Sequence, residues 1–172
     1  VNGQSLQQTE TANYEADTPG YFYTSDQGNP FAEQETDNTY IEWYVERDAV
    51  DYQFSLRYTA HDAVQVYEDV AEFTWQPISA DGMFEVKQAV IRVHLPAGAD
   101  LDEIRAWGHG PLHGNVEINS PTLVTLTLED IYPGDYMEVR LAMPNSLFPQ
   151  ATMLSGNRLG TILAEEEALA QQ

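Results

Sequence analysis

Apolar residues occupy every second position in four stretches of this sequence, and this alternation constrains the fold more than any other feature. The stretches are residues 50–58, 89–95, 124–128 and 137–143. Successive side chains of a β-strand point to opposite faces, so a period of two predicts strands with one buried and one solvated face. The sequence is therefore expected to build sheets that bury a single face each.

Shorter runs of strand-forming residues add further candidates at 21–23, 41–45, 71–75, 104–107 and 116–118. Turn-forming pairs such as Asp81-Gly82 and Pro133-Gly134 separate neighbouring candidates at strand-like intervals. No amphipathic helix lies between them. The pattern predicts an all-β fold, an antiparallel β-sandwich of about seven to nine strands.

Changes in polarity divide the chain into three expected parts. Residues 1–38 are polar and acidic, which predicts an N-terminal arm with at most one strand. Residues 39–150 contain most of the strand patterns and are expected to form the β-sandwich domain. Residues 151–172 contain good helix formers after a potential cap at Asn157, which predicts a short helical stalk leading toward a removed membrane segment.

The charge of the chain excludes several kinds of partner. Twenty-eight acidic residues stand against seven basic ones, giving a net charge of −21. Such a surface repels phosphate backbones and anionic headgroups, so we expect no nucleic acid and no anionic membrane surface as partner. The absence of cysteine excludes disulfides, thiolate catalysis and cysteine-ligated zinc.

The segment 107–114 (Trp-Gly-His-Gly-Pro-Leu-His-Gly) holds the first candidate binding residues, Trp107, His109 and His113. The two histidines are four residues apart, as in helical zinc motifs, but the glycines and the proline prevent a helix here. A tight turn with Trp107 packed at the edge of the sandwich is the interpretation we favour. We therefore expect no metal site and no cofactor.

Aromatic residues of the strand at 41–45 and its neighbour provide a second candidate surface. Tyr40 and Tyr44 alternate with Trp43, so aromatic side chains lie on both faces of this strand. One of these faces should look outward. Tyr40 and Tyr44 are therefore candidate residues for binding a glycan or a protein, and a carbohydrate-binding module is an alternative function.

Catalytic motifs give no support for an enzyme. The sequence contains neither a Gly-x-Ser-x-Gly elbow nor a phosphate-binding glycine loop followed by Lys-Ser/Thr. A metal-dependent hydrolase using His109 and His113 is a distant alternative. Clustered carboxylates at 100–103 and 129–135 leave open whether an acidic turn holds a calcium ion.

An ordered succession of motifs carries a family resemblance over about two thirds of the chain. It includes Asp-Val-Ala-Glu-Phe-Thr-Trp at 69–75, Val-Ile-Arg-Val-His-Leu-Pro at 90–96 and Ala-Trp-Gly-His-Gly-Pro at 106–111. Val-Arg-Leu-Ala-Met-Pro at 139–144 and the acidic tail at 162–167 complete it. In these motifs the chain resembles the extracellular domain of the bacterial predicted-membrane-protein family "domain of unknown function 2207".

This resemblance implies a setting rather than an activity. It implies a non-catalytic outer domain of a membrane-anchored bacterial protein, located on the extracellular side of the cell membrane, with a role in interaction, sensing or envelope organisation. The partner would be an unidentified protein or glycan at the cell surface. The family carries no established catalytic residues, so the resemblance assigns none to this chain.

Overall fold

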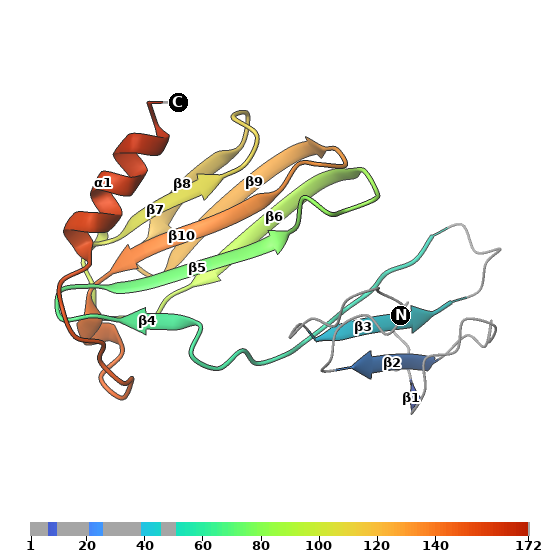
Figure 1. Cartoon of the computed structure of the whole chain (residues 1–172), viewed down its shortest axis with the longest axis horizontal. Helices are drawn as coiled ribbons and strands as arrows, with labels where there is room; N and C mark the ends of the chain where they lie inside the picture. The colour runs from blue at the N-terminus through green and yellow to red at the C-terminus, as the bar shows by residue number, and fades with distance from the viewer. Residues whose placement is uncertain (1–6, 10–20, 26–38, 46–50, 172) are drawn as a thin grey trace. The chain divides into compact units, whose positions relative to one another are not determined.

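A computed structural model describes residues 7–9, 21–25, 39–45 and 51–171 of the chain. The chain forms two compact units, Val1–Thr59 and Ala60–Gln172. The expected sandwich domain began at residue 39, whereas the units divide between Thr59 and Ala60. Figure 1 shows the strands of each unit.

The first unit contains a small sheet with the order β1-β2-β3. Its strands are β1 (Gln7–Thr9), β2 (Tyr21–Ser25) and β3 (Tyr40–Tyr44). β1 runs parallel to β2, and β2 runs antiparallel to β3. Two strands thus precede residue 38, where at most one was expected. The ring centroids of Trp43 and Phe54 lie 5.2 Å apart, so the segment after β3 contributes an aromatic contact to this unit.

The second unit contains two antiparallel sheets and a C-terminal helix. The four-stranded sheet has the order β4-β5-β10-β7, with β4 (Val64–Val66), β5 (Ala71–Ile78), β10 (Met137–Met143) and β7 (Arg105–His109). The three-stranded sheet has the order β6-β9-β8, with β6 (Val86–His94), β9 (Leu123–Ile131) and β8 (Asn115–Ser120). Two short 3-10 helices, η1 (Leu101–Glu103) and η2 (Asn145–Leu147), precede α1 (Leu159–Leu169).

The two sheets of the second unit pack face to face around one apolar core, which confirms the predicted β-sandwich. Alternate residues of the central strands supply this core: Val124, Leu126 and Leu128 of β9, and Val139, Leu141 and Met143 of β10. Their exposed fractions are all below 5%. The period of two in the sequence therefore marks the side chains that meet between the sheets.

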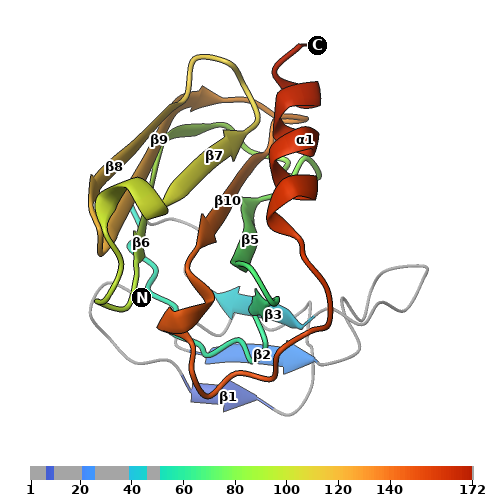
Figure 2. The same cartoon turned by 90° about the vertical axis from the view of Figure 1, so that its left-hand side faces the viewer.

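Helix α1 covers the outer face of the four-stranded sheet. Ile162 is fully buried and packs with Val70 and Ala142, and Ala142 points away from the sandwich core because it alternates with Leu141. Figure 2 shows α1 on one side of β5, β7 and β10, with β6, β8 and β9 on the other. The sequence predicted this helix as a stalk that leads out of the domain, whereas its apolar face lies against the sheet.

One of the four long alternating stretches was a wrong prediction. Residues 51–60 form no strand, and residue 50 lies outside the described residues. The exposed fractions of Phe54, Leu56 and Tyr58 are 45%, 50% and 61%. Alternation becomes a strand only where a neighbouring strand completes the hydrogen-bonded ladder, and residues 51–60 join no ladder in the described part of the chain.

Candidate functional site

The outer face of the four-stranded sheet gathers charged side chains beneath α1. Glu138, Arg140 and Ala142 occupy alternate positions of β10 and share this face. The strand register places His109 of β7 opposite Glu138, and Glu72 of β5 opposite Ala142. Directly paired residues of antiparallel strands point to the same side, so His109, Glu72 and Arg140 all face the helix.

Arg140 lies at the centre of this cluster and binds three carboxylates. Its Nε and Nη2 donate to Oε1 of Glu72 over 2.8 and 2.5 Å, and Nη1 donates to Oε1 of Glu166 over 2.8 Å. Nη2 also donates to Oε2 of Glu165 over 2.6 Å. Burial by itself would lower the pKa of Arg140, but the hydrogen bonds to Glu165, Glu166 and Glu72 outweigh it, so its pKa is raised. The guanidinium is therefore a permanent charge that ties α1 to β5.

Arg158 extends the cluster at the start of α1. Its Nε lies 3.1 Å from Oε2 of Glu72, and its Nη1 lies 3.0 Å from Oε1 of Glu165. Hydrogen bonds from Arg140 and then from Arg158 lower the pKa of Glu165 despite some opposing desolvation. Glu72 and Glu165 therefore each engage both arginines.

Asp69, in the turn between β4 and β5, satisfies the first backbone amides at the start of α1. Its Oδ1 accepts a hydrogen bond of 2.8 Å from the amide of Arg158, and its Oδ2 accepts one of 3.2 Å from the amide of Leu159. The helix begins after Arg158, so Asn157 is not its N-cap, contrary to the sequence-based expectation. The carboxylate of Asp69, which comes from another segment, accepts the hydrogen bonds of these amides instead. Its negative charge also interacts favourably with the positive end of the helix dipole.

His109 bridges the sheet and the helix. Its Nδ1 lies 2.8 Å from Oε1 of Glu138, and its Nε2 lies 3.0 Å from Oε2 of Glu166. Burial lowers the pKa of His109, but the hydrogen bonds to Glu166 and Glu138 raise this pKa by more than burial lowers it, so the net shift is upward. With a carboxylate at each nitrogen, the ring is held best as an imidazolium that donates from both.

A cavity of about 680 Å³ borders this network along α1. Its charged lining includes His109, Glu138, Arg158 and Glu165, and Tyr136 lies beside them. The cavity is lined by three carboxylates, Glu72, Glu138 and Glu165, and by three basic groups, His109, Arg140 and Arg158, so its charges balance when His109 is protonated. In the described part of the chain, no three His, Asp or Glu side chains are placed to hold a metal ion.

The structure distributes the predicted binding residues over three places. Trp107 is half-buried and packs under α1 with the cluster around Ile162, and His109 lies on the same face of β7. His113 is exposed in the loop after β7, where its Nε2 lies 2.8 Å from the carbonyl oxygen of Glu129. Tyr40 and Tyr44 are half-buried on β3 of the first unit. The hydroxyl of Tyr44 donates to Oε2 of Glu42 over 3.1 Å.

Sequence reasoning missed Glu72, Arg140 and Glu166, which are each less than 9% exposed. A signal for Arg140 was present, because it is the one charged residue in the apolar run from Val139 to Met143. Glu165 and Glu166 of α1 are partners that the buried arginine requires.

Comparison with known proteins identifies the family. The model of the predicted membrane protein (DUF2207) N-terminal domain matches residues 3–143, which include all ten strands of the described residues. No curated protein and no solved structure matches the chain. No helix in the described residues is long and apolar enough to cross a membrane. The match covers more than half of the sequence and agrees with the motif resemblance, so the chain belongs to the DUF2207 family of predicted membrane proteins.

Proposed function

We propose that this chain is a non-catalytic domain on the extracellular side of a membrane-anchored bacterial protein, where it serves interaction or sensing. The observation that carries the proposal is that the ionisable groups beneath α1 pair with one another. His109, Arg140 and the glutamates around them bind one another and hold the helix on the sheet. Groups engaged in this way support a structural role rather than acid–base chemistry.

The setting of the domain is supported by its family and its composition. Membership of a predicted membrane protein family supports attachment of the parent protein to a membrane. A net charge of −21 and the absence of cysteine are compatible with a solvated domain outside the cell, where free thiols are a liability. His109 is held between two carboxylates, which disfavours a metal-dependent hydrolase, and Tyr40 and Tyr44 are half-buried, which disfavours a carbohydrate-binding module.

Thiol labelling in intact cells tests the location. Because the chain has no cysteine, a single Leu101→Cys substitution in the full-length protein introduces one reporter at a residue that is 50% exposed. The proposal expects a membrane-impermeant maleimide to label this cysteine in intact cells. Labelling only after permeabilisation would place the domain in the cytoplasm and overturn the proposal.

Two controls allow the labelling result to be interpreted. The full-length protein without the substitution reports labelling of any cysteine outside this chain. Val139→Cys places the thiol at a residue that is 0% exposed, so it should be labelled only after unfolding. If the maleimide labels Leu101→Cys and Val139→Cys equally well in intact cells, the reagent is reaching unfolded protein.

A further inference from the structure

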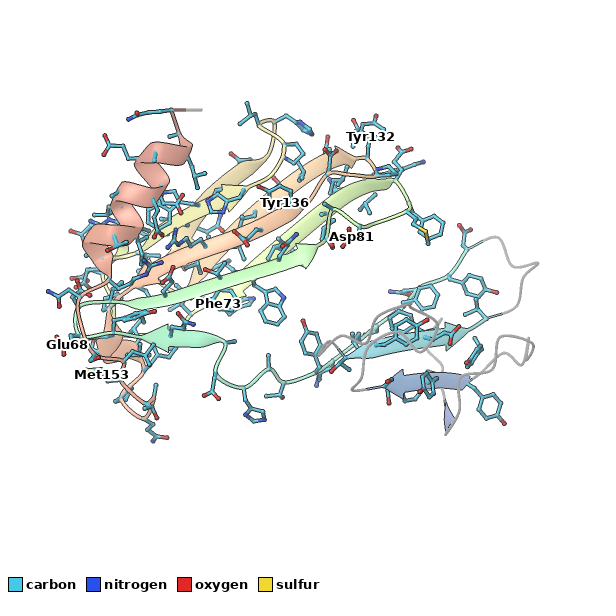
Figure 3. The ribbon with its side chains drawn as sticks, in the orientation of Figure 1. Glu68, Phe73, Asp81, Tyr132, Tyr136 and Met153 are labelled. Atoms are coloured by element: carbon cyan, nitrogen blue, oxygen red, sulfur yellow. The ribbon has the colours of Figure 1, made fainter. Side chains whose placement is uncertain are left out.

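Three loops of the second unit lie at the same end of the sandwich. β5 ends at Ile78 opposite Met137, and β9 ends at Ile131 opposite Val86, so the loops that follow these two strands lie at the same end. β7 ends at His109 opposite Glu138, which brings its following loop to this end as well. We call the loops 79–85, 110–114 and 132–136 together the loop end. Figure 3 labels Asp81 and Tyr132 there.

The loop end exposes large apolar side chains from all three loops. Leu112 is fully exposed, Met83 and Phe84 are 80% and 79% exposed, and Tyr132 and Tyr136 are 55% and 39% exposed. Single exposed apolar residues are common on protein surfaces, but several on neighbouring loops point to a binding surface. Long unbranched or aromatic side chains such as Met and Phe are also those that interfaces use most.

Backbone contacts fix two of these loops, 110–114 and 132–136. Gly110 has φ of +141°, and a Cβ there would come within 2.3 Å of the carbonyl oxygen of Tyr136, so two of the loops are in close contact. His113 Nε2 donates to the carbonyl oxygen of Glu129, which ties the same loop to β9. The amide of Tyr132 donates to Oδ2 of Asp135 over 2.9 Å. The part of the loop end that these two loops form therefore loses little conformational entropy when it binds.

The charges of the loop end indicate the chemistry of the partner. Its loops contain the carboxylates of Asp81, Glu85 and Asp135, and none of the residues 79–85, 110–114 or 132–136 is Lys or Arg. Glu129 and Asp130 at the end of β9 add two more carboxylates and Lys87 at the start of β6 adds one cation, so a negative excess remains. A second copy would bring the same negative charge, and an anionic lipid surface would be repelled, so both are disfavoured.

We propose that the loop end docks a positively charged protein segment that carries apolar side chains. This inference rests on the proposed function, because it names the surface and the partner chemistry of the interaction domain. Apolar anchors of the segment pack among Leu112, Met83 and Phe84, while its basic residues face the surrounding carboxylates. The segment 107–114 thus serves two purposes, since Trp107 and His109 hold α1 and the following loop presents Leu112.

Binding of synthetic peptides by the full 172-residue chain tests this proposal. The probe is a fluorescent peptide of Lys and Leu, compared by anisotropy with a Lys/Ser peptide of equal charge and a Glu/Leu peptide of equal apolarity. We expect the Lys/Leu peptide to bind at least about tenfold more tightly than either comparison peptide. Equal binding of the Lys/Ser peptide would reduce the interaction to general charge attraction and overturn the proposal.

A matched pair of variants locates the binding surface. Met83→Ser with Leu112→Ser removes two apolar residues from the loop end, and Met153→Ser with Leu154→Ser removes the same residue types elsewhere, where they are 56% and 41% exposed. The first variant should weaken binding of the Lys/Leu peptide by about tenfold or more, and the second should bind like the wild type. Equal affinities of the two variants would overturn the proposal.

Two further measurements test whether the loop end binds a membrane or a second copy of this chain instead. Binding to phosphatidylcholine vesicles that is lost in the Met83→Ser/Leu112→Ser variant would assign the loop end to a membrane instead. A dimer in light scattering that the same variant abolishes would assign it to a second copy. Either result overturns the docking of a basic segment, and neither bears on the location, which the labelling of Leu101→Cys reports separately.

Discussion

His109 of β7 and Glu138 of β10 are direct cross-strand partners, and Nδ1 of the histidine lies 2.8 Å from Oε1 of the glutamate. The second ring nitrogen lies 3.0 Å from Oε2 of Glu166 on α1. An imidazole donates from both nitrogens only when it is protonated. The contact between the sheet and the helix therefore includes one cross-link whose strength depends on pH.

The stability of the second unit should decrease as the pH rises through the pKa of His109. This pKa is raised in the folded chain above its ordinary value of 6.5, because the hydrogen bonds to Glu166 and Glu138 outweigh desolvation. The stabilisation is fully present below the unfolded-state pKa and is lost as the pH passes the folded-state pKa. One proton gives a slope of at most about 1.4 kcal/mol per pH unit. Urea unfolding across the neutral range measures it.

His109→Gln should flatten this pH dependence, because glutamine keeps a polar side chain but no titrating group. His113→Gln is the matched control, since His113 is exposed and lies outside the network beneath α1. It should retain the pH dependence of the wild type. An unchanged slope in His109→Gln would mean that other groups account for the effect.

Arg140→Met should destabilise the second unit by about 3–5 kcal/mol, because it removes the cation that binds both Glu72 and Glu166 and leaves these buried carboxylates only partly paired. Denaturant unfolding at low and high salt measures this loss. Since the pairs are buried, we expect salt to change the difference little. Arg92→Met on the exposed side of β6 is the control and should stay within about 0.5 kcal/mol of the wild type. A similar small loss for Arg140→Met would contradict the buried network.

Ile162→Ala should separate the role of apolar packing from that of the charges. Ile162 is fully buried against Val70 and Ala142, so its truncation should cost about 2–5 kcal/mol and increase hydrogen exchange throughout α1. Leu163→Ala, at the next residue of the same helix, removes a side chain that is 39% exposed. Its cost should stay below about 1 kcal/mol. Equal losses in the two variants would show that the helix is not docked through Ile162.

Local pattern was sufficient to predict the strands of the sandwich core. Residues 137–143 form β10 with the predicted bounds, because this strand is central, pairs on both sides and carries an uninterrupted apolar face. Residues 51–58 carry a similar alternation and form no strand. The difference lies in the pairing partner, which is set by contacts between distant segments and is not encoded in the alternation itself.

The charge network joins residues that are far apart along the chain, so local pattern does not reveal it. Glu72 and Arg140 are 68 residues apart and meet only because β5 pairs with β10. Glu166 joins them because the buried side of α1 includes both Ile162 and Glu166, four residues apart on one helix face. Of the predicted site residues, His109 alone enters the network, and no local pattern connects it with Glu138 rather than with His113.

Gly110→Ala should destabilise the second unit and displace the loop end. The glycine has φ of +141°, where an L-residue is strained, and a Cβ would come 2.3 Å from the carbonyl oxygen of Tyr136. Gly134→Ala is the matched control, because Gly134 has φ of +99° and nothing lies within 4 Å of its Cβ position. The control should lose about 1–2 kcal/mol from backbone strain alone. Gly110→Ala should lose more and also weaken binding of the Lys/Leu peptide, whereas equal losses and unchanged binding would mean that the two loops adjust independently.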